Sequence, residues 1–234
     1  MRLMFIDAPV RTPRSGVLLV ILASIWLAVF GNLALWRTLR QLPDITGWHG
    51  FAFGVAFAVI IASMVVVVLS IFAWRWTLKL AISLLLLMAA FATHYMLMYG
   101  IVVDTPMVIN VFQTDTREAR DQLSWQLLFT VLTLAVAPMV WLWRQPVTPT
   151  QLGKQALHNL TLFLGGLALA FGTTQLVFQD FSSLMRNYID LRYQINPLNS
   201  VYALLDMTVI PAEQPRGPLQ SLGLDAQISP RATV

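Results

Sequence analysis

Three side chains in the middle of the sequence have types and a spacing suited to binding a polar ligand. Asn110, Thr114 and Glu118 are four residues apart, so one continuous helix would place an amide, a hydroxyl and a carboxylate on one face. A carboxylate can bind an ammonium group, while an amide and a hydroxyl can hydrogen-bond to phosphate oxygens. The pattern therefore suits a zwitterionic head group, provided that the helix continues through Gln113.

A structural role for Glu118 is an open alternative. Asp115, with Glu118 three residues later, forms a variant of the capping box, in which the glutamate satisfies backbone N–H groups at a helix start. Thr105 followed by Pro106 predicts another helix start, with threonine at the N-cap and proline at the first helical position. From spacing alone, capping is the favoured role of Glu118.

These residues belong to a polar segment, residues 94–123, between strongly apolar runs. The chain has 234 residues, of which 57% are hydrophobic and 11% are charged, and its mean hydropathy is +0.69. A soluble domain usually carries about 25% charged residues. The composition therefore indicates an integral membrane protein. Its net charge of +4 is better explained by cations that flank membrane spans than by nucleic-acid binding.

Five apolar runs are long enough to cross a bilayer as helices. About 20 residues span a hydrocarbon core of about 30 Å. The predicted fold is therefore all-α, with transmembrane helices at about 16–36, 51–73, 80–98, 125–143 and 157–178. The first run is longer than the core of a secretory signal and has no clear cleavage site, so we expect an uncleaved anchor. Pro138 should kink the fourth span.

The distribution of cations predicts the orientation. Residues 1–15, the turn at 74–79 and the loop at 144–156 together carry seven cations and would lie on one side of the membrane. Cytoplasmic loops are enriched in lysine and arginine. We therefore expect a cytoplasmic N-terminus, with the helical loop 99–124 and the C-terminal tail on the periplasmic side.

The tail is predicted to contain two kinds of structure. Residues from about 180 to 192 alternate apolar and polar side chains at helical spacing, which is typical of a helix lying in the membrane interface. Residues 211–234 contain four prolines and no hydrophobic period, which indicates an extended linker. Residues 1–210 would then form the transmembrane domain.

Several other kinds of site and function find little support in the sequence. The chain has no cysteine, and its three histidines lack the spacing of common metal motifs. His94, at a span end, suits a structural histidine better than a catalytic one. The predicted spans contain no Asp, Glu, Lys or Arg, which argues against a small-solute transporter. A stand-alone lipid-binding or accessory membrane protein without catalysis remains the main alternative to an enzyme.

Two motifs resemble one known family. The segment 99–119 is similar to the signature of the lipid A phosphoethanolamine transferases, which include the mobile enzymes of resistance to colistin, a polymyxin. The family pattern Met-x-x-Asn-x-x-x-Thr-Asp-x-x-Glu is matched by Met107, Asn110, Thr114, Asp115 and Glu118. The tail resembles the family's bridging region through Arg186, Asn187, Leu191, Arg192, Tyr193, Asn196, Pro197 and Asn199.

The resemblance implies a multi-pass protein of the bacterial inner membrane. Such enzymes move phosphoethanolamine from phosphatidylethanolamine to lipid A of lipopolysaccharide. It also implies that Asn110, Thr114 and Glu118 hold the donor head group, which favours binding over capping for Glu118. The family's zinc ion and threonine nucleophile belong to a periplasmic domain, expected beyond Val234. We therefore expect no catalytic residue and no metal ligand in this chain, and no transfer by this chain alone.

Overall fold

The computed structural model describes residues 15–43, 45–114, 117 and 122–209, and within these ranges the chain forms helices and no β-strand. The all-α membrane class predicted from hydropathy is confirmed. The elements are α1 (Gly16–Phe30), α2 (Leu33–Leu39), α3 (Gly47–Ile71), α4 (Leu78–Tyr99), α5 (Thr105–Gln113), α7 (Trp125–Val131), the π-helical turn η1 (Leu132–Val136), α8 (Ala137–Trp143), α9 (Leu152–Leu176), α10 (Phe178–Asn187), the 3-10 helix η2 (Ile189–Gln194) and α11 (Leu198–Val209).

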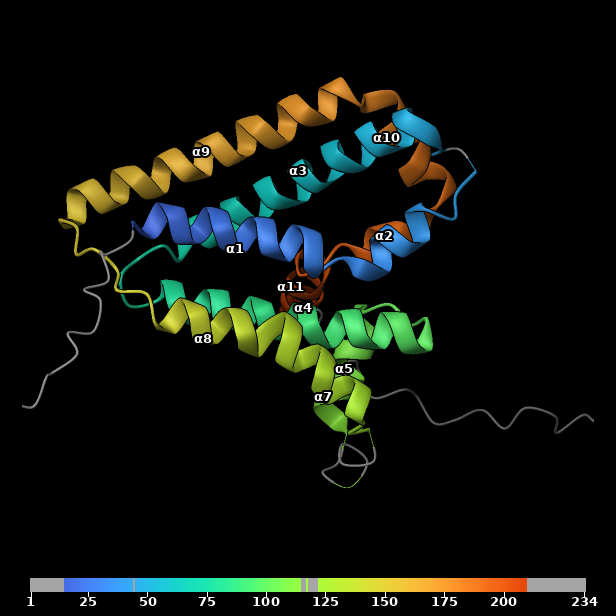
Figure 1. Ribbon diagram of the computed structural model, residues 1–234, viewed down its shortest axis with the longest axis horizontal. Coiled ribbons are helices and arrows are strands. Elements are labelled where there is room, and N and C mark those ends of the chain that lie inside the picture. Colours follow the sequence, from blue (N-terminus) through green and yellow to red (C-terminus); the bar gives the residue numbers. More distant parts are fainter. Residues whose placement is uncertain (1–14, 44, 115–116, 118–121, 210–234) are drawn as a thin grey trace, which may run out of the picture.

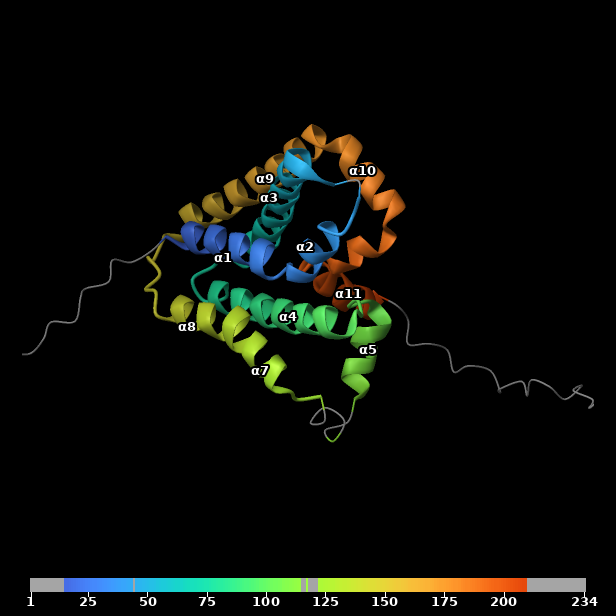
Figure 2. The same ribbon diagram turned by 45° about the vertical axis from the view of Figure 1, so that its right-hand side comes forward.

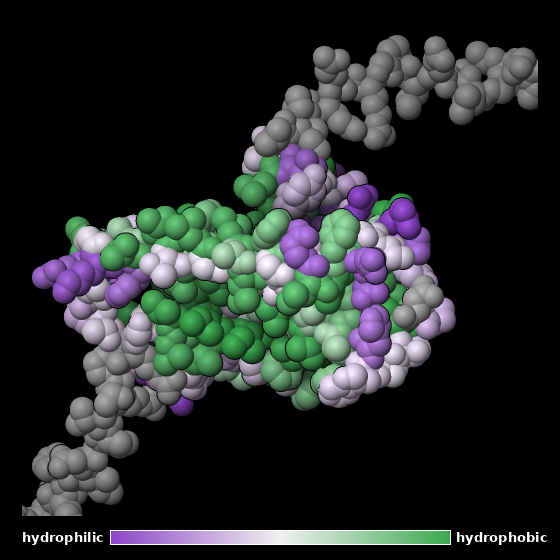
Figure 3. Space-filling view, turned by 90° about the horizontal axis from the view of Figure 1, so that it is seen from above, coloured by the Kyte–Doolittle hydropathy of each residue, from purple (hydrophilic) through white to green (hydrophobic). Residues whose placement is uncertain are grey.

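Four of the helical units are long and apolar enough to cross a membrane, or five if one bent pair is counted, against the five apolar runs in the sequence. By length and composition, α3, α4, α9 and the continuous α7–η1–α8 unit can each cross a membrane, and α1 with α2 provides a fifth span if this bent pair counts as one. Figure 3 shows one face of the molecule, where a broad hydrophobic band separates hydrophilic residues gathered at two ends. This distribution is the one expected of a surface in contact with lipid.

The long helices pack side by side in the order α9, α3, α1, α4 and α7–α8 (Figure 1). Phe53 and Phe57 of α3, Leu27 of α1 and Ile82 of α4 are almost completely buried and belong to one apolar core. The outer helices α9 and α7–α8 expose most of their residues. Because these exposed residues are mainly apolar, lipid is their natural environment.

The first span is bent where α1 meets α2. We expected one helix over about 16–36, but the two helices differ in direction by 48°. The Asn32 side chain donates to the Leu27 carbonyl (2.9 Å), and the Thr93 hydroxyl of α4 donates to the Gly31 carbonyl (2.7 Å). A Cβ added at Gly31 would lie 3.2 Å from the Ala89 Cβ of α4, so glycine permits a close approach of the two helices. Side-chain hydrogen bonds therefore stabilise the bend.

The fourth span contains the π-helical turn η1, which ends two residues before Pro138. Proline has no backbone N–H, so the Leu134 carbonyl loses the donor it would have in a regular α-helix. The indole N–H of Trp26, from α1, donates to this carbonyl at 3.1 Å. The kink expected from Pro138 thus takes the form of a π turn whose unpaired carbonyl is satisfied by a neighbouring helix.

The tail folds back on the bundle as three short helices. The segment expected as one helix over about 180–192 consists of α10 and η2, which meet at Tyr188. Leu184 and Leu191 are buried, so each of these elements turns an apolar side chain toward the bundle. The sequence analysis missed α11, which contacts α4, α5 and η2 (Figure 2). Its position makes the tail a support for α5.

Candidate lipid head-group site

The site begins at the end of α4, where Gly100 reverses the chain toward α5. Gly100 has φ 66°, a left-handed conformation that glycine adopts without strain, and its N–H bonds to the Met96 carbonyl at 3.1 Å. Asp104 then caps α5, since its carboxylate accepts from the Met107 N–H at 2.9 Å. The N-cap predicted at Thr105 is therefore one residue too late. An aspartate in this position is itself a preferred N-cap, so the signal was present in the sequence.

Thr105 has a different role from the predicted one. Its hydroxyl donates to Oδ2 of Asp206 in α11 at 2.7 Å. In the same region the Asn199 side chain donates to the carbonyls of Val103 and Tyr193, the latter at 2.9 Å. The start of α5 is thus bonded to the tail in both directions, because Thr105 donates to the tail and Asn199 of the tail donates to Val103.

The tail is in turn tied to the bend in the first span. The Asn32 side chain pairs with the backbone of Asn196, accepting from its N–H (2.8 Å) and donating to its carbonyl (2.7 Å). Both asparagines are completely buried. Asn196 belonged to the tail motif, but its partner Asn32 was missed, because 164 residues separate them and an isolated asparagine in an apolar run has no local signal.

The end of α5 carries two of the three predicted site residues. Asn110 is exposed, and its side chain has no hydrogen-bond partner among the residues the structure describes. The Thr114 hydroxyl is half-buried and donates to the Asn110 carbonyl at 2.8 Å. The structure therefore brings Asn110 and Thr114 together at one helix end. Glu118 lies outside the described residues, and α5 ends at Gln113, with Thr114 in an extended conformation. The continuous helix that would align all three side chains is not formed.

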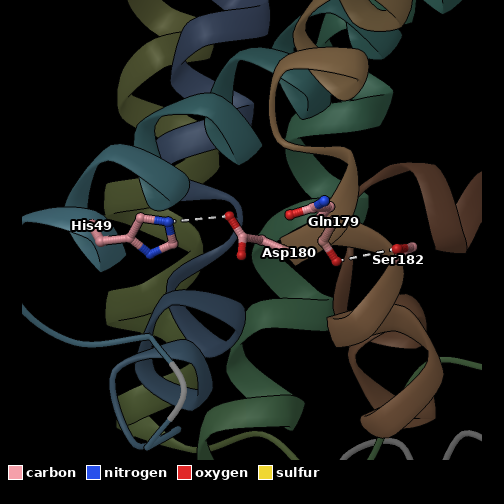
Figure 4. Close-up of polar contacts among 4 residues, drawn as sticks. All are labelled: His49, Gln179, Asp180 and Ser182. Atoms are coloured by element: carbon pink, nitrogen blue, oxygen red, sulfur yellow. Dashed lines mark hydrogen bonds and ion pairs between the residues drawn. The ribbon is translucent and has the colours of Figure 1, made fainter.

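Other polar residues hold the surroundings of the site in place. His94 is buried, packs against Tyr95 and Tyr99 and has its Nδ1 atom 3.4 Å from the Thr130 hydroxyl, which fits a structural histidine. Near the start of α3, His49 contacts Asp180 of α10 at 3.3 Å (Figure 4). This contact was not anticipated, and it shows that Asp180 of α10 lies beside the start of α3.

The described part of the chain contains no group of three or more His, Asp or Glu residues that could hold a metal ion. Asn110 and Thr114 present an amide and a hydroxyl at the end of α5, a helix whose start is bonded to the tail. These groups can hydrogen-bond to a polar head group.

Comparisons with known proteins agree with the two motifs. The family described as phosphoethanolamine transferase EptA/EptB matches residues 61–210. The chain is 26% identical over 212 residues to phosphatidylethanolamine transferase Mcr-1 of Escherichia coli, covering 91% of this chain and 39% of Mcr-1. It is 24% identical over 185 residues to phosphoethanolamine transferase EptA of Escherichia coli K12, covering 79% of this chain and 34% of that protein. The chain thus spans less than half the length of these relatives.

The fold also matches a solved structure. The integral membrane protein lipooligosaccharide phosphoethanolamine transferase A (EptA) from Neisseria meningitidis aligns with a TM-score of 0.75 at 22% identity, covering 82% of this chain and 36% of that one. At this identity the match establishes the fold of the membrane helices. The sequence match covers more than half of the residues, so the resemblance is confirmed and the chain belongs to the EptA/EptB family of phosphoethanolamine transferases.

Proposed function

We propose that this chain is the membrane region of an enzyme that moves phosphoethanolamine from phosphatidylethanolamine to a lipid A phosphate. It anchors the enzyme in the bacterial inner membrane, with the N-terminus cytoplasmic and the loop 99–124 periplasmic, and it forms part of the donor head-group site. The observation that carries the proposal is the pairing of Asn110 and Thr114 at the exposed end of α5, in a chain that belongs to this family.

The hydrogen bonds at the end of α5 suggest separate roles for the two residues. The Asn110 amide is exposed and can donate to a phosphate oxygen. The Thr114 hydroxyl already donates to the Asn110 carbonyl, so its oxygen is left to accept, which suits an ammonium N–H. Glu118 is retained from the sequence motif as a carboxylate for the same ammonium group.

The anchoring of α5 supports this assignment. The start of α5 is bonded to the tail through Asp206 and Asn199, whereas Asn110 and Thr114 lie at its other end. A site built on a fixed helix loses little conformational entropy when it binds a ligand. The chemistry of transfer, with the zinc ion and the threonine nucleophile of the family, is expected in a periplasmic domain outside this sequence. The membrane region would then bind the donor and hold it beneath that domain.

The test uses the natural gene product, including any coding sequence that continues past Val234. Asn110→Ala and Glu118→Ala should each lower transfer to lipid A by about tenfold or more, because each removes a hydrogen bond to a charged group. Mass spectrometry of lipid A measures transfer, and membrane fractionation checks insertion. Gln113→Ala is the matched control, since Gln113 is exposed at the end of the same helix but is not part of the proposed site.

Full transfer by both variants would overturn the head-group site. A second measurement separates the proposal from its alternative, a membrane protein that binds lipid without catalysis. If the natural gene product binds phosphatidylethanolamine in an Asn110-dependent manner but adds nothing to lipid A, the alternative is correct and the transferase proposal fails.

A further inference from the structure

A groove of about 650 Å³ lies between α2, the loop that follows it and the first half of α3, on the other side of α2 from the pocket at the end of α4. Its described lining is mainly apolar and includes Val29, Trp36, Phe51, Gly54 and Val55, with Arg40 among its few polar residues. The volume falls within the range of small-molecule sites, about 300–1,000 Å³. The groove contains neither Asn110 nor Thr114, so it is separate from the proposed donor site.

Glycine leaves the floor of the groove empty. A Cβ built at Gly54 would meet no heavy atom within 4 Å, so the space above this residue is open. One turn earlier, a Cβ at Gly50 would lie 2.6 Å from the carbonyl carbon of Ile45, so the loop packs directly on α3 there. The loop thus covers α3 at Gly50, and the groove is open at Gly54.

The walls of the groove are preformed. The Trp36 indole N–H donates to the Val29 carbonyl at 2.9 Å, and the ring meets Phe57 edge-on with centroids 6.2 Å apart. On the outer rim, Phe51 and Val55 are 62% and 49% exposed. A rigid apolar groove that opens on a lipid-facing surface is suited to a hydrocarbon chain.

The polar residues place one part of the groove near the membrane interface. Arg40 directly follows α2, and its guanidinium makes no hydrogen bond or ion pair with any described residue. Trp48, at the start of α3, is 81% exposed, as is typical of tryptophans at a membrane–water interface. An arginine near the interface, beside an apolar groove, is complementary to a lipid phosphate with its acyl chain below.

We propose that this groove binds one anionic glycerophospholipid, with an acyl chain over Gly54 and its phosphate on Arg40. Arg40 has no ion-pair partner among the described residues, which favours phosphatidylglycerol, with its net negative charge, over the zwitterionic phosphatidylethanolamine. One groove of this volume suits a lipid with two chains better than lipid A with its many chains. The inference does not depend on the proposed transfer reaction.

Native mass spectrometry of the full chain, with phosphatidylglycerol and phosphatidylethanolamine in competition, tests the proposal. The unaltered chain should retain phosphatidylglycerol preferentially. Arg40→Gln should weaken its binding by about tenfold, the factor for one charged hydrogen bond. Gly54→Leu should reduce binding at least as much, because its side chain fills the open space over α3.

Two control variants match these changes. Arg37→Gln removes the same charge from the opposite side of α2, where Arg37 lines a different pocket. Gly165→Leu adds the same side chain at an open position on α9, away from the groove. Both should bind phosphatidylglycerol as the unaltered chain does. Equal retention of the two phospholipids, stronger retention of lipid A, or no difference between test and control variants would overturn the proposal. If Arg40→Gln failed to fold, as seen by circular dichroism, Gly54→Leu would decide.

Discussion

The contact between α3 and α9 and the junction between Asn32 and Asn196 hold helices together by different means. At the first, Gly166 lets α9 approach so closely that an added Cβ would lie 2.9 Å from Val67 Cγ2. At the second, one amide side chain makes three buried hydrogen bonds. In lipid, apolar surfaces gain little from leaving their solvent, so helices associate through close packing and polar bonds. The chain uses close packing between the long antiparallel helices α3 and α9, and polar bonds where segments distant in the sequence meet.

The largest expected effect comes from breaking the polar junction. Asn32→Ala removes both partners of the Asn196 backbone and one donor to Leu27, so we expect a loss of about 3 kcal/mol of stability or more. The unfolding temperature, followed by tryptophan fluorescence in detergent, measures the effect. Ser24→Ala is the control, because Ser24 is equally buried but its hydroxyl has no hydrogen-bond partner in the structure. Equal loss in both variants would show that burial, and not hydrogen bonding, matters here.

A smaller effect is expected from breaking the close packing. Gly166→Leu forces α9 away from α3, because a Cβ already meets Val67 and the Ser63 carbonyl. Overpacking of this kind costs about 1–3 kcal/mol. Gly165→Leu, where an added Cβ meets nothing within 4 Å, should leave the same fluorescence transition unchanged. A similar shift in the two variants would contradict the close contact.

The smallest effect concerns a polar bond outside the core. His49 and Asp180 are 71% and 42% exposed, so their contact is screened by solvent and contributes less than about 1 kcal/mol. His49→Gln should therefore leave the unfolding temperature almost unchanged, yet increase hydrogen exchange in α10, which this contact links to α3. Unchanged exchange in α10 would show that its apolar residues alone hold the helix.

Hydropathy was sufficient to predict the helical class, because long apolar runs have only one stable form in a bilayer. It did not reveal the bend at Gly31 and Asn32, since that bend depends on Thr93 and Asn196, which are far away in the sequence. The helix α11 was also missed. This helix is too short for a span, and it lacks the strongly polar face of α10.

The candidate site was predicted in part. The motif led to Asn110 and Thr114, which the structure places together. The bonds that hold α5, from Thr105 to Asp206 and from Asn199 to Val103, could not be read from spacing because their partners are about a hundred residues apart. The roles of Asn110, Thr114 and Glu118 in binding a donor lipid stay predictions.

The π turn in the fourth span has a consequence for the register of that helix. Leu127, Ala135 and Leu142 are its buried residues, at intervals of eight and seven. In a regular α-helix of 3.6 residues per turn, eight residues fall about 80° beyond two full turns, which would carry Ala135 off the face that Leu127 occupies. The wider turn at Leu132–Val136 takes up the additional residue and restores the alignment. The span therefore accommodates what amounts to a one-residue insertion, and a chain one residue shorter here could keep the same face toward α4.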